Sequence, residues 1–391
     1  MTVPPTTPAS TPAPQAEARL PRRTVIAAAS TMAAGAALTP TASAAPDTPD
    51  ATAAPDTTPT GTDASLPGTT TATFPSTRTK SATGETPVEA AFPIGHVSVR
   101  WDGTDTTAGG AIRLHDTDRG PGEWQPFGED GCGCSLANGG GLLLPAGLGS
   151  GYELKAPEGA TGLRSLALDT RHGPGRRTAV PSEPTRVRGV AYVSRAAWGA
   201  DESLRFKADG SENSPTEYHP FQTITVHHTA MANNDPDPAA TVRAIYQLHT
   251  VTNDWGDIGY HFLVDEEGRV YEGRYSGADG LPAHDPDGRL VTAFHVGGHN
   301  PGNLGIALLG TFTEQSPKKA AHTALTGLVR ALVRLHGVDP RARVTYTHPI
   351  NGTQREVPEI SGHRDWMATR CPGEVMYQEL NRLRRTVAEG R

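Results

Sequence analysis

Residues 221–229 read FQTITVHHT, a stretch rich in β-branched side chains that ends in two adjacent histidines, His227 and His228. Side chains of this type favour a β-strand. Successive side chains of a strand point to opposite faces, so only one of the two histidines can reach a given site. We therefore expect a strand that delivers a single histidine to a site at its end.

The sequence on the carboxyl side of this stretch alternates between helical and strand patterns. Apolar residues at helical spacing predict three helices, over residues 239–250, 317–336 and 373–389. Apolar runs predict further strands over residues 257–264, 269–272 and 304–310, the first two joined by a tight turn. Strands mixed with helices in this way predict an α/β fold over residues 190–391, a mixed central β-sheet flanked by helices.

The part of the chain before this domain has a different pattern. Short apolar or alternating runs separated by turn residues predict a small β-rich, sandwich-like domain over residues 88–171, whose role the sequence does not indicate. Residues 172–189 are rich in Gly, Pro and Arg and predict a linker. Cys132 and Cys134 are too close for an unstrained disulfide and lack a second pair to complete a metal site, so they are either loop thiols or a strained disulfide.

The first 87 residues are expected to lie outside any folded domain. Arg22 and Arg23 precede an uncharged apolar run over residues 24–38, which resembles a twin-arginine-type signal peptide over residues 1–44. The run is too short to span a membrane stably, so we expect a protein secreted to the cell wall or beyond. Residues 45–87 are dominated by Ala, Pro and Thr and predict a disordered linker.

Composition and charge exclude several classes of protein. The chain has 391 residues, and its 35 Lys and Arg against 42 Asp and Glu give a formal charge of −7, which argues against a nucleic-acid partner. With 44 Gly and 34 Pro, the chain does not have the composition of a helical bundle. Three cysteines are too few for a disulfide scaffold. We expect a monomer.

A second group of candidate metal ligands lies near the carboxyl terminus. His363 stands eight residues before Cys371, the sole cysteine of the C-terminal domain. One histidine from the strand, together with His363 and Cys371, would supply the three ligands typical of a catalytic zinc site with one open position. The spacing alone is equally compatible with a buried cysteine and structural histidines.

Five segments in order resemble the motifs of the peptidoglycan recognition protein family, which belongs with the zinc-dependent N-acetylmuramoyl-L-alanine amidases. These segments are residues 226–230 (VHHTA), 257–262 (DIGYHF), 270–274 (VYEGR), 299–310 (HNPGNLGIALLG) and 362–373 (GHRDWMATRCPG). The resemblance covers about residues 190–390 and leaves the signal-like segment, the linker and the β-rich region outside it. It implies the fold of that family for the C-terminal domain.

The resemblance also implies roles for individual residues. It makes His227, His363 and Cys371 the zinc ligands, selecting His227 from the histidine pair. Tyr260 matches the active-site tyrosine of the family, and Thr369 matches a position near the reacting carbonyl that members fill with lysine or threonine. Members that only bind peptidoglycan commonly lose the cysteine or the strand histidine, whereas this chain keeps both.

The implied activity is hydrolysis of the amide bond between N-acetylmuramic acid and L-alanine in bacterial peptidoglycan, by a water that Zn²⁺ activates near neutral pH. Thr369 would stabilise charge on the carbonyl oxygen, and Tyr260 would orient the water or stabilise the tetrahedral intermediate. His295 and His299 are candidates for contacts with the glycan or peptide of a muropeptide, although loop histidines can also be supporting or exposed residues. The alternative function is a non-catalytic peptidoglycan-binding module.

Overall fold

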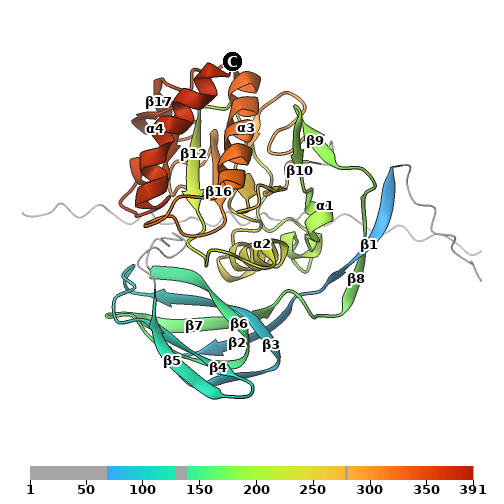
Figure 1. Ribbon diagram of the computed structural model, residues 1–391, viewed down its shortest axis with the longest axis vertical. Coiled ribbons are helices and arrows are strands. Elements are labelled where there is room, and N and C mark those ends of the chain that lie inside the picture. Colours follow the sequence, from blue (N-terminus) through green and yellow to red (C-terminus); the bar gives the residue numbers. More distant parts are fainter. Residues whose placement is uncertain (1–67, 128–138, 278–280, 391) are drawn as a thin grey trace, which may run out of the picture. The chain divides into compact units, whose positions relative to one another are not determined.

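The computed structural model describes residues 68–127, 139–277 and 281–390 (Figure 1). The predicted signal peptide over residues 1–44, most of the predicted linker, Cys132 and Cys134 lie outside the described residues. Among the residues that are described, no helix combines the length and the apolar character needed to cross a membrane.

A five-stranded mixed sheet forms the centre of the C-terminal half. Its strands, in spatial order, are β14 (Val270–Glu272), β13 (Phe262–Val264), β16 (Asn303–Leu308), β12 (Thr223–His228) and β19 (Ile360–Gly362). Strand β12 runs parallel to both of its neighbours, and only β14 is antiparallel to its partner. The predicted mixed central sheet is therefore confirmed.

Helices cover both faces of this sheet, as predicted. On one face, α3 (Lys319–His336) and α4 (Glu374–Glu389) lie side by side over β12 and β16 (Figure 1). On the other face, α2 (Pro238–Gln247) packs against Leu263 and Ala307 and continues as a π-helical turn, Leu248–Thr252. The alternation along each strand thus divides the apolar core into two layers, one on each side of the sheet.

The N-terminal described region is a six-stranded antiparallel sheet. Its strands, in spatial order, are β2 (Arg78–Thr83), β7 (Thr161–Asp169), β3 (Val88–Asp102), β6 (Gly139–Lys155), β4 (Ala111–Asp116) and β5 (Gly120–Pro126). This single sheet corrects the expectation of a sandwich-like pair of sheets. The two long strands β3 and β6 shift register near Ile94, and such irregularities bend a sheet, so one sheet can enclose its own apolar core.

Ordered strands also extend into both segments that the composition predicts to be linkers. Strands β1 (Thr69–Pro75) and β2 lie before residue 88, and β8 (Gly175–Pro181) lies within residues 172–189. Strand β1 pairs with β8 along its whole length. The pairing joins polar segments that are about a hundred residues apart, by backbone hydrogen bonds that composition does not reveal.

The remaining elements are short. They comprise the strand pairs β9 (Thr185–Val187) with β10 (Val190–Tyr192), β11 (Tyr218–His219) with β15 (Leu290–Val291), and β17 (Arg343–Thr347) with β18 (Gln354–Pro358), the helix α1 (Arg195–Trp198) and the 3-10 helices Glu202–Arg205 and His363–Asp365. The hairpin β17–β18 was not predicted from the sequence.

Candidate metal centre

The register of the central sheet brings two histidines together. Strands β12 and β19 are parallel, and Val226 pairs with Gly362 at their carboxyl ends. The next residue after each is a histidine, His227 within β12 and His363 directly after the end of β19, so the two imidazoles extend from the same edge of the sheet. Their ring centroids lie 4.5 Å apart, and both residues are buried.

The neighbouring histidine of β12 points to the other face. The ring of His228 lies near Phe312 in the layer under α3 and α4, and its Nδ1 accepts a hydrogen bond from the Phe312 backbone N–H at 3.4 Å. Strand alternation therefore separates the pair, and His227 is the member that faces His363.

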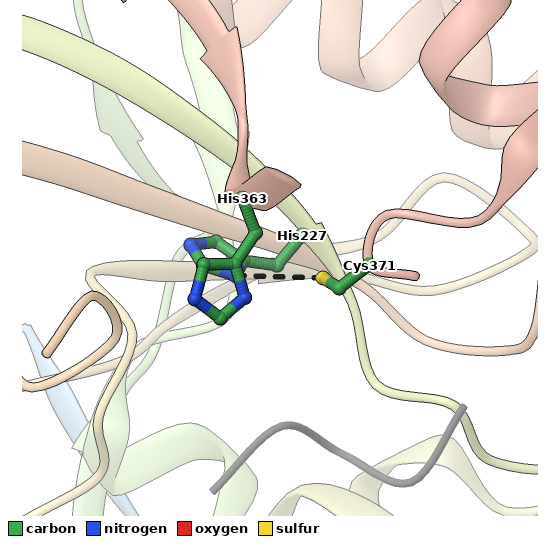
Figure 2. Close-up of side chains that lie close together, drawn as sticks. All are labelled: His227, His363 and Cys371. Carbon is green, nitrogen blue, oxygen red and sulfur yellow. Dashed lines mark hydrogen bonds between the residues drawn. The ribbon is translucent and has the colours of Figure 1, made fainter. Parts of the chain in front are cut away.

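A loop after β19 adds a sulfur to the two imidazoles. The backbone N–H of Arg364 donates to the carbonyl oxygen of Cys371 at 3.1 Å, which closes the loop before α4 begins. Cys371 Sγ then lies 3.6 Å from His227 Nδ1. Figure 2 shows the three side chains converging, and one potential ligand atom from each of His227, His363 and Cys371 lies within 4.8 Å of the others.

The geometry of this cluster fits a tetrahedral metal ion. At zinc–nitrogen and zinc–sulfur bond lengths of about 2.0–2.1 and 2.3 Å, two ligands of a tetrahedron lie about 3.6 Å apart. That is the observed separation of His227 Nδ1 and Cys371 Sγ. In the described structure, His363 Nε2 is buried and has no hydrogen-bond partner, which is unfavourable for a polar atom without a ligand.

The electrostatics of the cluster favour neutral imidazoles. Burial, and after it the proximity of His363, holds the pKa of His227 well below its ordinary value. Burial also lowers the pKa of His363 to about 3, with His295 and His228 adding to the effect. A neutral imidazole has a nitrogen lone pair to give to a metal, so both rings are in the protonation state that coordination needs.

The backbone of β12 also contacts the sulfur of the cysteine. The N–H of His228 donates to Cys371 Sγ at 3.4 Å. A hydrogen bond to the charged form of a group stabilises that form, and a thiolate is the form of cysteine that binds metals. Strand β12 thus contributes a candidate ligand and a donor to the neighbouring ligand.

Tyr260 and Thr369 border the same cluster. The Tyr260 ring is nearly buried, and its centroid lies 5.4 Å from that of His227. The Thr369 oxygen accepts a hydrogen bond from the backbone N–H of Cys371 at 3.2 Å, so its hydroxyl proton remains able to donate elsewhere. Both side chains therefore lie next to the candidate ligands, and their catalytic roles stay predictions.

The two loop histidines predicted to contact substrate differ in position. His295 is only 7% exposed, and both of its ring nitrogens have partners, His227 Nε2 at 3.0 Å and the Asn303 carbonyl oxygen at 2.9 Å. It has no ring nitrogen left for a glycan or peptide, so the structure does not support that role. His299 is partly exposed beside the rings of Tyr346 and Trp366, and its substrate contact stays a prediction.

Sequence reasoning missed a carboxylate that organises the His363–Cys371 loop. Asp365 Oδ2 accepts from the Gly362 backbone N–H at 2.8 Å, and its Oδ1 accepts from the Tyr377 hydroxyl on α4 at 2.6 Å. The sequence did contain a signal for this role, because an acidic residue in the first turn of a helix commonly accepts a hydrogen bond from the backbone N–H just before the helix, as Asp365 does from Gly362.

Known proteins are similar to the part of the chain that carries this site. The family described as N-acetylmuramoyl-L-alanine amidase matches residues 217–374. Mouse peptidoglycan recognition protein 1 is 31% identical over 191 residues, which cover 48% of this chain and 85% of the mouse protein. Human N-acetylmuramoyl-L-alanine amidase is 31% identical over 170 residues, which cover 41% of this chain but only 24% of the human protein.

Solved structures of peptidoglycan recognition proteins also match. The crystal structure of Drosophila peptidoglycan recognition protein SD is 25% identical, with a TM-score of 0.35, and the match covers 49% of this chain and 94% of that one. Because the match to the mouse protein spans most of that relative at 31% identity, the chain belongs to the family of peptidoglycan recognition proteins and N-acetylmuramoyl-L-alanine amidases.

Proposed function

We propose that the protein is an exported, zinc-dependent N-acetylmuramoyl-L-alanine amidase. It hydrolyses the amide bond between the lactyl group of N-acetylmuramic acid and L-alanine in peptidoglycan. The observation that carries this proposal is the buried convergence of His227, His363 and Cys371, whose ligand atoms lie within 4.8 Å of one another. The Arg22-Arg23 segment supports export, which would bring the protein to its substrate.

The donor set favours zinc and a catalytic role. Two neutral imidazoles and a thiolate suit Zn²⁺, whereas carboxylate and carbonyl oxygens suit Mg²⁺ or Ca²⁺. Three protein ligands are also one fewer than structural zinc sites use. When bound here, zinc would supply a Lewis acid that activates water and polarises the amide carbonyl.

The chain's own residues would do the remaining work. The Thr369 hydroxyl can donate to the carbonyl oxygen as negative charge develops on it, while its oxygen holds the backbone N–H of Cys371. The Tyr260 hydroxyl can orient the attacking water or donate to the same oxygen. Removal of one such donor typically slows acyl-transfer reactions about 100- to 1,000-fold.

A digest of purified bacterial peptidoglycan tests the proposal. We expect new alanine amino termini without new reducing sugars, because the amide bond is cut and the glycosidic bonds are not. A chelator should abolish the release and added Zn²⁺ should restore it. Wall binding without released peptide would instead support the non-catalytic binding module.

A cysteine variant tests the ligand set directly. Cys371→Ser should lose most bound zinc and most activity, because the hydroxyl of serine is a much poorer ligand than a thiolate. The double variant Cys132→Ser/Cys134→Ser is the matched control, since it replaces two other cysteines and keeps all three clustered side chains. Full zinc content in folded Cys371→Ser protein would reject the assignment.

A further inference from the structure

A second histidine lies directly behind one of the candidate ligands. His295 Nδ1 is 3.0 Å from His227 Nε2, the ring nitrogen on the far side from Cys371, and the two rings are nearly perpendicular. The other nitrogen of His295 lies 2.9 Å from the carbonyl oxygen of Asn303, the first residue of β16. The three groups form a continuous hydrogen-bonded chain that leads to the metal cluster.

The chemistry of the end groups fixes the direction of every hydrogen bond in this chain. The Asn303 carbonyl oxygen can only accept, so His295 Nε2 carries a proton and donates it. In a neutral ring, His295 Nδ1 is then an acceptor, and His227 Nε2 must be the donor. His227 therefore keeps its lone pair on Nδ1, the nitrogen that lies 3.6 Å from Cys371 Sγ.

The fold holds the His295 ring in this position. A Cβ added to Gly305, in the middle of β16, would lie 2.6 Å from two atoms of the ring, so the absence of a side chain there makes room for it. The Asn300 side-chain oxygen accepts hydrogen bonds from the backbone N–H groups of His295 and Val296, at 2.9 and 2.8 Å.

We propose that His295 is a positioning residue that fixes the tautomer and the orientation of His227, so that His227 Nδ1 faces the metal. The proposal rests on the zinc site proposed above. A metal-ligating histidine usually donates its second ring N–H to an oxygen acceptor, and loss of such a partner typically weakens metal binding about 10- to 100-fold. Here an imidazole takes the place of that acceptor and is itself held by a backbone carbonyl.

Two substitutions distinguish positioning from mere space filling. His295→Phe keeps a ring but has no acceptor, whereas His295→Gln has an amide oxygen to accept and an amide N–H to donate. In competition with a fluorescent chelator, we expect His295→Phe to bind Zn²⁺ about 10- to 100-fold more weakly. We expect His295→Gln to recover most of that loss. Absorption spectra of the Co²⁺-substituted proteins should change in the same order.

The chain offers a matched control in another buried histidine pair. His284 Nε2 lies 3.0 Å from His336 Nε2, and His284 is 5% exposed. His284→Phe breaks a contact between two imidazoles at the same distance, 3.0 Å, as the one between His295 and His227. None of the three candidate ligands takes part in it. Its Zn²⁺ affinity should equal that of the wild type. Wild-type affinity in folded His295→Phe protein would overturn the proposal.

A readout without metal keeps the test independent of the zinc assignment and of the folding of His295→Phe. Long-range proton–nitrogen NMR spectra of the metal-free wild-type protein report which nitrogen of each imidazole carries the proton. We expect the Nε2–H tautomer for both His227 and His295. If His227 is protonated on Nδ1, the positioning role of His295 is overturned. If His227 is protonated on Nε2 but the wild-type protein binds no Zn²⁺, only the proposed function is rejected.

Discussion

Among the side chains beside His227, His363 and Cys371, Tyr260 is the one whose contribution is most easily isolated. Its ring centroid is 5.4 Å from that of His227, and it is not one of the three candidate ligands. Tyr260→Phe keeps the ring and removes only the hydroxyl. We expect kcat to fall about 100-fold, while the zinc content stays at the wild-type level. Peptide release and metal analysis on the same preparation check both parts, and loss of zinc would show that the tyrosine supports the metal site instead.

Glu359, between β18 and β19, gives stability a dependence on pH. The residue is 2% exposed, and its Oε1 has no hydrogen-bond partner among the described residues. Burial, reinforced by the nearby Asp339, raises the pKa of this carboxyl to about 7. An unfolded chain has a glutamate pKa of about 4.3, so between these two values the folded protein binds more protons than the unfolded one.

The contribution of Glu359 to the stability of the folded protein should therefore fall as pH rises from about 4.3 through 7. Glu359→Gln removes the ionisation and keeps the shape. At pH 8 we expect the variant to be more stable than the wild type by up to about 3 kcal/mol, with a smaller advantage near pH 5. Glu356→Gln, an exposed glutamate on β18, is the control and should show no such trend. Denaturant unfolding at several pH values measures both variants, and a constant difference for Glu359→Gln would contradict the prediction.

The carboxylate of Asp365 links two elements, the 3-10 helix that starts with His363 and the helix α4. Asp365→Ala removes the acceptors of the Gly362 N–H and the Tyr377 hydroxyl. We expect the loop that carries His363 and Cys371 to loosen and the Zn²⁺ affinity to fall about 10-fold or more, as is typical for residues that orient ligands. Tyr377→Phe is the graded control, because it removes one of the two hydrogen bonds and should cause a smaller loss in chelator competition.

The sequence predicts the long helices and four of the five central strands of the C-terminal half, because these have strong local patterns, but it does not predict β19. The stretch that became β12 is β-branched, and the segments that became α3 and α4 have apolar residues at helical spacing. The position of His295 could not be predicted in the same way. That position depends on Gly305 of β16, which makes room for the ring, and on the register between the parallel strands β12 and β16. Neither feature can be recognised from a short stretch of sequence.

The difference between local patterns and long-range packing also explains why the predictions for the N-terminal half were partly wrong. Strands β1 and β8 are polar, and they pair although about a hundred residues separate them. The single bent sheet arises from register shifts in β3 rather than from its composition. The resemblance supplies the candidate ligands because its motifs are local in the sequence, whereas the hydrogen-bond partners that orient these side chains are set by long-range packing.

At the scale of the whole molecule, the six-stranded sheet and the α/β region share a core. All described residues belong to one compact unit. Leu143 and Leu168 of the sheet belong to the same apolar cluster as Val242 of α2. Buried Arg243 donates to the carbonyl oxygens of Thr170 at 3.1 Å and Trp198 at 2.9 Å. These contacts indicate that the two regions stabilise each other.

We therefore expect the described unit to unfold in a single cooperative transition, with equal calorimetric and van't Hoff enthalpies. Arg243→Met should lower the free energy of unfolding by about 2 kcal/mol, because it leaves two buried carbonyl oxygens without their donor. The single transition should move as a whole. Arg382→Met, an exposed arginine on α4, is the control and should change stability by less than about 0.5 kcal/mol. Differential scanning calorimetry measures the number of unfolding transitions. Two separate transitions, or a shift of only one of them in Arg243→Met, would mean that the six-stranded sheet and the α/β region fold independently.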